Sequence, residues 1–210
     1  MPFPTKLEIA PGIFLWSGAL KPAAQEKLVA EVFTLAEVSP FYRPAMPKSG
    51  KPFSVEETNF GSLGWISTAQ GYRYAKEHPL THTPWPAIPE ILLALWNAAT
   101  DYRAPPECCL VNLYREGARM GLHQDRDERA LDAPVVSVSL GDDALFRIGG
   151  GTRKGPTRSL PLKSGDVVAF GGPARLAFHG IDRIVFGSSR LVPGGGRLNL
   201  TLRRVMPPGT

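Results

Sequence analysis

Residues 197–203 read Arg-Leu-Asn-Leu-Thr-Leu-Arg, and polar and apolar side chains alternate strictly along this stretch. Because successive side chains of a strand point to opposite faces, the pattern predicts a β-strand with three leucines on one face. The other face carries Arg197, Asn199, Thr201 and Arg203. A half-exposed strand would produce the same alternation. Two arginines flanking an asparagine are instead typical of a wall that receives anions, since guanidinium groups bind carboxylates through paired hydrogen bonds.

Further short strands are expected in the second half of the chain, between glycine-rich turns. They cover residues 110–114, 135–140 and 166–170. The first of them places Asn112 and Tyr114 on one face. Two helices are expected upstream, one from Pro22 to about Val38 and one opened by Pro89. Residues 41–86 are rich in proline and aromatic residues, which favours short hairpins and long loops. Short strands separated by glycine turns predict a barrel or a jelly roll.

The composition limits the class of protein. Hydrophobic residues make up 43% of the 210 positions and charged residues 20%, which is too apolar for a disordered chain. Cys108 and Cys109 are adjacent, which leaves no disulfide framework and fits a reducing compartment. No apolar run approaches the length of a membrane span, and no targeting segment is visible. We therefore expect a cytoplasmic, monomeric protein of one domain, residues 1–210, without a membrane partner.

Three residues have the spacing of a metal site. His123 and Asp125 lie two positions apart, on the same side of an extended segment, and His179 follows in an apolar stretch. Two histidines and one carboxylate cover one face of an octahedral Fe(II) ion and leave three positions open. The alternatives are that His123 is a hydrogen-bonded residue of a surface loop and that His179 is a core histidine whose ring nitrogens have hydrogen-bond partners. His78 and His82 have helical zinc-site spacing, but Pro79 argues against a helix through them, and we assign both to a loop.

The combined motifs resemble the AlkB family of Fe(II)- and 2-oxoglutarate-dependent dioxygenases, and within it the bacterial repair branch. The similarity covers roughly residues 40–204. It rests on the two histidines and the aspartate, on the 197–203 strand, and on further segments at residues 63–65, 70–72, 84–86, 122–128, 133–141, 165–168 and 179–181. The resemblance implies an α+β fold with a double-stranded β-helix (jelly-roll) core at about 105–205. N-terminal helices and a nucleotide-recognition lid would accompany this core, and the N-terminal extension with the substrate lid would occupy about 1–86.

The family also implies roles for individual residues. His123, Asp125 and His179 would bind Fe(II), and O2 and 2-oxoglutarate would be cosubstrates. The residues that would hold 2-oxoglutarate are Asn112, Tyr114, Arg197, Asn199 and Arg203. The residues that would contact the substrate are Trp65, Tyr72, Tyr74, Asp127 and Arg153. The implied reaction is oxidative removal of N-alkyl groups from bases such as 1-methyladenine and 3-methylcytosine, with release of formaldehyde. Single-stranded DNA is the favoured partner, and RNA is a second one.

Some residues depart from the family pattern. Glu57 stands in the lid where close bacterial relatives have an apolar residue, and Arg126 replaces a lysine. Two other functions remain open at this point. One is the same iron chemistry on a protein side chain or a small molecule. The other is a non-catalytic jelly-roll module that holds zinc, although such a module would not need paired arginines for a dicarboxylate.

Nucleic-acid binding should depend steeply on salt. The chain carries a net charge of +5, and basic residues lie near the expected site at positions 73, 76, 126, 153 and 154. Lysine and arginine contacts to phosphates release counterions, so oligonucleotide affinity should fall sharply between low and moderate salt. The measurement is a titration of a labelled oligonucleotide at several salt concentrations. A flat response would favour a protein or small-molecule substrate and would assign the charge to a solvated surface.

Overall fold

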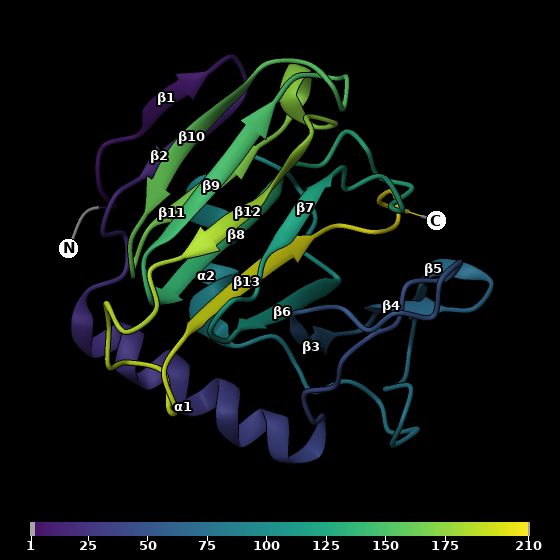
Figure 1. Cartoon of the computed structure of the whole chain (residues 1–210). Helices are drawn as coiled ribbons and strands as arrows, with labels where there is room; N and C mark the ends of the chain where they lie inside the picture. Colours follow the sequence, from purple (N-terminus) through teal and green to yellow (C-terminus); the bar gives the residue numbers. More distant parts are fainter. Residues whose placement is uncertain (1–2, 210) are drawn as a thin grey trace.

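Two antiparallel sheets form the body of the molecule (Figure 1). The computed structural model describes residues 3–209. The larger sheet has the order β1-β2-β11-β8-β13-β6-β3. Its strands are β1 (Leu7–Ala10), β2 (Ile13–Trp16), β3 (Glu56–Gly61), β6 (Cys108–Tyr114), β8 (Val135–Gly141), β11 (Val167–Phe170) and β13 (Arg197–Arg203). The smaller sheet has the order β10-β9-β12-β7 and consists of β7 (Met120–His123), β9 (Ala144–Gly149), β10 (Thr157–Leu162) and β12 (His179–Ile184).

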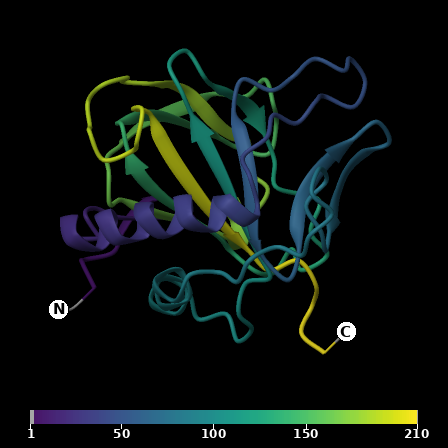
Figure 2. The ribbon, with the colours of Figure 1, turned by 90° about the horizontal axis from the view of Figure 1, so that it is seen from below.

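The two helices cover the outside of the larger sheet. They are α1 (Pro22–Val38) and α2 (Glu90–Ala99), and Figure 2 shows α1 lying across the strands. Leu28 and Val32 of α1 and Trp96 of α2 are fully buried in one cluster with the outward side chains of β6, β8 and β13. A second cluster fills the space between the sheets and includes Phe146 and Ile181 of the smaller sheet. The arrangement is the predicted jelly roll with N-terminal helices.

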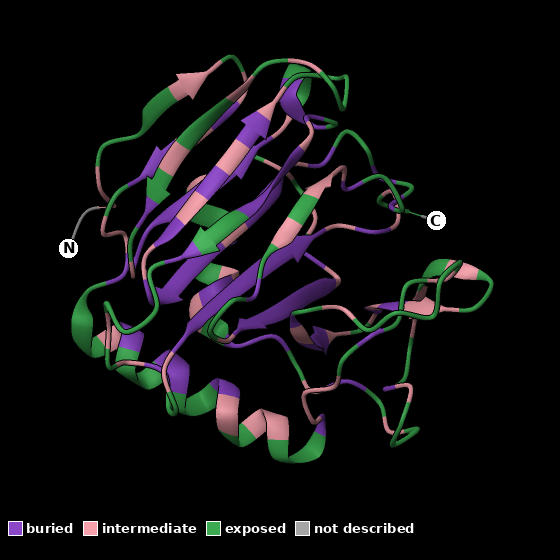
Figure 3. Cartoon of the chain, viewed as in Figure 1, coloured by how far each residue is buried: buried purple, intermediate pink, exposed green. Residues whose placement is uncertain are grey.

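The central strand β13 has both of its faces buried. It pairs with β8 on one side and with β6 on the other, and all seven of its residues are buried (Figure 3). Leu198, Leu200 and Leu202 point toward the helices, so the polar face points into the space between the sheets. The half-exposed alternative is therefore wrong, because the smaller sheet and the segments joined to it cover that face.

The two helices follow the prediction closely, with Pro22 in the first turn of α1 and Pro89 at the N-cap of α2. The proline-rich segment contains the hairpin of β4 (Gly64–Thr68) and β5 (Gly71–Ala75), which projects beside the sheets in Figure 1. The same segment also supplies β3, an edge strand that pairs with β6. Its sequence, Glu-Glu-Thr-Asn-Phe-Gly, has no apolar alternation, which is why sequence reasoning did not assign it to the main sheet. Neither helix in residues 3–209 has the length and apolarity needed to cross a membrane.

Candidate active site and metal centre

The predicted metal ligands come together between the sheets. His123 ends β7 and His179 begins β12, and the two residues are direct partners across the strand pair. The Nε2 atom of His123 lies 3.7 Å from Oδ1 of Asp125, and that of His179 lies 3.9 Å from Oδ2. One ligand atom from each residue falls within 4.8 Å of the others. Gly180 allows this close pairing, since a Cβ there would lie 2.5 Å from the Met120 carbonyl oxygen.

The local hydrogen bonds prepare both histidines to bind a metal. Nδ1 of His123 lies 3.0 Å from the Gly121 carbonyl oxygen, and Nδ1 of His179 lies 2.9 Å from that of Ala177. A proton on each Nδ1 leaves each Nε2 with a free lone pair, and both Nε2 atoms lie within 4 Å of a carboxylate oxygen of Asp125. Burial, together with the neighbouring His123, lowers the pKa of His179 to about 4, so the ring is neutral at neutral pH. The residues present therefore fit a two-histidine, one-carboxylate Fe(II) site.

Two arginines hold the Asp125 segment in place. Arg203 donates to both carboxylate oxygens, Nη2 to Oδ1 at 2.8 Å and Nε to Oδ2 at 3.1 Å. Arg175 donates to the backbone carbonyl of Asp125, to that of Ala133 and to the carboxylate of Glu128. Although burial opposes ionisation, Arg203 and the two histidines hold the pKa of Asp125 well below its usual range. The carboxylate is therefore charged and oriented before any metal arrives.

Arg197 is a buried cation without a carboxylate partner among the described residues. Its Nη2 donates to Oγ of Ser139 at 2.9 Å, and its guanidinium lies 5.3 Å from the centre of the Tyr114 ring. Nε and Nη1 have no hydrogen-bond partner in residues 3–209, and neither does Oδ1 of Asn112. A buried guanidinium with two free donors has the chemistry to receive a carboxylate from a ligand.

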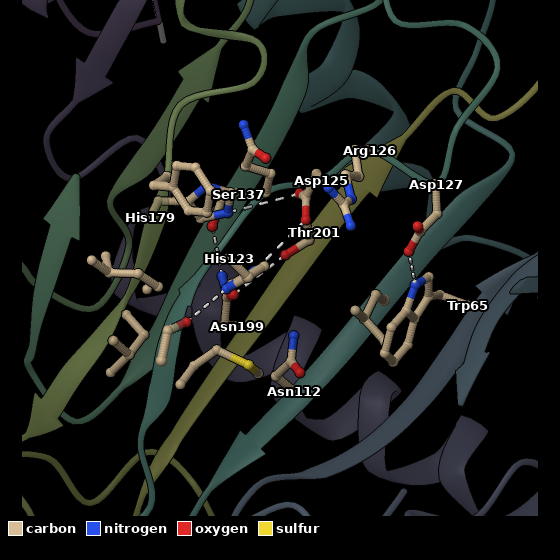
Figure 4. A pocket seen from close by; sticks show the side chains of 18 of the residues that line it. Trp65, Asn112, His123, Asp125, Arg126, Asp127, Ser137, His179, Asn199 and Thr201 are labelled. Atoms are coloured by element: carbon tan, nitrogen blue, oxygen red, sulfur yellow. Dashed lines mark hydrogen bonds and ion pairs between the residues drawn. The ribbon is translucent and has the colours of Figure 1, made fainter. Parts of the chain in front are cut away.

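An aromatic pair faces the metal ligands from the hairpin. The rings of Trp65 and Tyr72 stack with centres 4.9 Å apart. Nε1 of Trp65 donates to Oδ2 of Asp127 at 2.9 Å. Figure 4 shows Trp65 and Asp127 on one side of the pocket and the triad on the other, with Asn112 near the lower part of the gap.

One cavity of about 440 Å³ joins these groups. Its lining includes every residue that sequence reasoning assigned to the site except Tyr74: His123, Asp125, His179, Asn112, Tyr114, Arg197, Asn199, Arg203, Trp65, Tyr72, Asp127 and Arg153. Asn199 lies directly between Asn112 and Ser139 in the strand register and donates to Ser137 at 2.6 Å. The structure thus brings together residues that lie as far apart as positions 65 and 203.

Tyr74 is the one predicted substrate residue that does not line the cavity. Its hydroxyl donates to Glu128, whose other oxygen accepts from Arg175 at 3.0 Å. Nε of Arg203 lies 3.6 Å from Glu128. A buried network therefore links the hairpin to Asp125 through Glu128 and Arg203. Sequence reasoning missed Glu128 and Arg175, and the only signal was a charged residue inside the otherwise apolar stretch at 174–178.

Glu57 also lines the cavity. It pairs with Asn112 across β3 and β6, and only 1% of its surface is exposed. Burial raises its pKa to about 8, although Arg203 acts in the opposite direction. At neutral pH this carboxyl group is therefore mostly protonated, a state in which it can donate as well as accept a hydrogen bond.

Known proteins resemble this chain over most of its length. Residues 12–203 match the 2OG-Fe(II) oxygenase superfamily. The alpha-ketoglutarate-dependent dioxygenase AlkB homolog of Caulobacter vibrioides is 60% identical over 200 residues, which cover 94% of this chain and 90% of the relative. The alpha-ketoglutarate-dependent dioxygenase AlkB of Escherichia coli is 44% identical, with 86% of this chain and 85% of the relative covered. The solved structure of OsALKBH1 superposes with a TM-score of 0.80 at 30% identity, covering 95% of this chain and 100% of the other.

The protonated state of Glu57 should make folding stability depend on pH. The unfolded chain releases this proton near the ordinary pKa of 4.5, whereas the folded protein keeps it to about 8. Between these values the folded state binds more protons, so the stability contributed by Glu57 falls as the pH rises. Chemical denaturation of the wild type and of Glu57→Gln should show the variant gaining relative stability from about pH 5 to about pH 8.

Glu56→Gln is the matched control for this measurement. Glu56 is the preceding residue of β3, is partly exposed and pairs with Arg43 at 3.1 Å. It should not reproduce the trend. A constant stability difference between Glu57→Gln and the wild type across the range would contradict the protonated state.

Proposed function

Because this chain belongs to the AlkB family of Fe(II)- and 2-oxoglutarate-dependent dioxygenases, we propose that it repairs nucleic acids by removing N-alkyl groups from bases. The substrates are cationic lesions of the 1-methyladenine and 3-methylcytosine type in DNA, and RNA is a second substrate. The observation that carries the proposal is the single cavity in which the iron triad, a buried unpaired arginine and an aromatic hairpin all meet. A protein that only stored a metal would need the three metal ligands but neither the unpaired arginine nor the aromatic hairpin.

The cosubstrate lies along the polar face of β13. Arg197 receives the distal carboxylate of 2-oxoglutarate through the two nitrogens that lack partners, with Tyr114 and Asn112 beside it. Arg203 and Asn199 face the carboxylate nearer the metal. Because the guanidinium groups are buried, these charge-assisted hydrogen bonds are stronger than the same contacts in water. When held by His123, Asp125 and His179, Fe(II) would supply, with 2-oxoglutarate and O2, the oxidation of the N-alkyl carbon, and an N-methyl group would then leave as formaldehyde.

The substrate base enters from the hairpin side. A base must leave the stack before it reaches a buried centre, and this costs least in single-stranded DNA. Trp65 stacks on the base, and Tyr72 moves aside from its contact with Trp65 to meet the backbone of the flipped nucleotide. Asp127 and Arg153 lie near the base edge. Tyr74 acts through Glu128 and positions the hairpin relative to Asp125. Stacking on an indole ring also favours cationic bases.

The central test of the proposal is whether methylated oligonucleotides stimulate the enzyme. Single-stranded DNA with 3-methylcytosine should raise the release of succinate and formaldehyde together, and the unmethylated strand should not. Asp125→Ala should abolish this turnover while the protein stays folded, because Glu128 remains 3.6 Å from Arg203 as a counter-charge. The exposed Asp101→Ala serves as the control. Stimulation by methylated peptides and not by oligonucleotides would reject the nucleic-acid substrate.

Asp127 should contribute more to cationic lesions than to neutral ones. Asp127→Asn removes the charge and keeps an oxygen that can accept the hydrogen bond from Trp65. An alanine variant would remove both the charge and this hydrogen bond. The group is exposed, so we expect a loss of about 1 kcal/mol, or roughly fivefold in kcat/KM, for cationic bases. The measurement compares kcat/KM for a cationic and a neutral N-methylated base. Equal losses on both would mean that Asp127 positions the base without responding to its charge.

A further inference from the structure

Glu57 is a buried carboxyl group for which the proposed reaction has no use. The triad binds the metal, and the arginines of β13 bind the cosubstrate. Glu57 nevertheless lines the same cavity, and its Oε2 has no hydrogen-bond partner among the described residues. An unpaired polar atom that is withheld from water costs stability. Such a cost points to a contact that only a ligand completes.

Glu57 lies between the residues proposed to bind the cosubstrate and the hairpin proposed to bind the substrate. In the strand register it stands directly opposite Asn112, which in turn stands opposite Asn199. Glu57 is therefore the last polar residue of this row, on the edge strand that leads into the hairpin of Trp65. The edge strand β3 lies two strands away from β13, which carries the cosubstrate arginines, so the partner of Glu57 is more naturally the substrate than the cosubstrate.

The charged and polar neighbours leave this oxygen free. Arg203 influences Glu57 through its charge, but its hydrogen bonds go to Asp125. Tyr42 is joined to Glu57 by two backbone hydrogen bonds, and its own hydroxyl also lacks a partner in residues 3–209. The other residues of segment 46–57 that line the cavity are Met46 and Phe53, both apolar. Among the residues of segment 46–57 that line the cavity, Glu57 is thus the polar one, and Asn112 opposite it belongs to the cosubstrate wall.

We propose that Glu57 is a specificity-determining residue that favours N-alkyl adducts carrying a hydrogen-bonding group over apolar adducts of the same size. The inference rests on the proposed function, since it assumes an alkylated base in this cavity. A hydroxyalkyl adduct supplies the missing hydrogen bond to Oε2. An apolar adduct of equal size expels water from that wall and leaves the oxygen unpaired. A methyl group fills less of the cavity than either of these adducts and so displaces less water from the wall beside Oε2.

A matched pair of substrates isolates this effect. The two substrates are single-stranded oligonucleotides that carry either 3-(2-hydroxyethyl)cytosine or 3-propylcytosine. The first adduct has a terminal hydroxyl group where the second has a methyl group. The wild type should favour the hydroxyethyl adduct by about tenfold in kcat/KM. Glu57→Met should reduce this ratio to near one by improving the propyl substrate. Glu57→Gln should keep most of the preference, because an amide also donates and accepts. Glu56→Gln, on the partly exposed side of the same strand, should match the wild type.

Thermal stability separates a recognition role from a packing role. If Glu57 serves recognition, Glu57→Met removes an unpaired buried carboxyl and should raise the melting temperature by about 2–4 °C. Glu57→Leu gives the same comparison with a second apolar side chain. A wild-type ratio near one, or an unchanged ratio in a folded apolar variant, overturns the inference alone as long as 3-methylcytosine is still turned over. Failure of the wild type on 3-methylcytosine overturns the proposed function, and this inference with it.

Discussion

The bidentate ion pair between Arg203 and Asp125 is the contact on which the rest of the site depends. It joins the end of the central strand to the loop that carries the carboxylate ligand, and both side chains are buried. Removing one member of a buried pair typically costs about 3–5 kcal/mol when the other charge is left without a partner, and Glu128 reduces that cost here because it lies 3.6 Å from Arg203. The pair therefore keeps the carboxylate ionised and holds it in one orientation. Arg175 and Glu128 extend the network to the next turn of chain and to the hairpin.

The two faces of the larger sheet therefore have different roles, one in packing against the helices and one in lining the site. The outward face packs leucines and valines against α1 and α2 in a continuous apolar cluster. The inward face carries arginine, asparagine and threonine from β13 in the space between the sheets. Because buried polar groups add little net stability even when paired, the hydrophobic stabilisation comes from this helix-covered cluster and from the second apolar cluster between the sheets. The fold can then keep a polar, partly unpaired interior at the site.

Four of the five buried side-chain atoms that lack a hydrogen-bond partner in residues 3–209 lie around one cavity, and the Tyr42 hydroxyl is the fifth. Nε and Nη1 of Arg197, Oδ1 of Asn112 and Oε2 of Glu57 all belong to residues that line the cavity. Proteins rarely leave such groups unpaired in the interior, so a group of them around one cavity indicates where ligand atoms belong. The arginine atoms suit a carboxylate. The glutamate atom suits a hydrogen-bond donor, and it lies farther along the row toward the hairpin.

Elements whose patterns are local could be predicted from the sequence. The strict alternation at 197–203, the spacing of His123 and Asp125, and the prolines that open both helices each depend on neighbouring residues, so periodicity was sufficient to predict them. The resemblance to a known family then assigned roles to twelve of the residues that line the cavity, the three metal ligands included. Only the tertiary structure showed that the polar face of β13 is buried, that Tyr74 bonds to Glu128, and that Glu57 sits unpaired at the end of the row opposite Asn112. Burial and hydrogen-bond partners depend on segments that lie far apart in the chain. The local sequence of β3 or around Arg175 therefore does not indicate which distant side chains these residues contact.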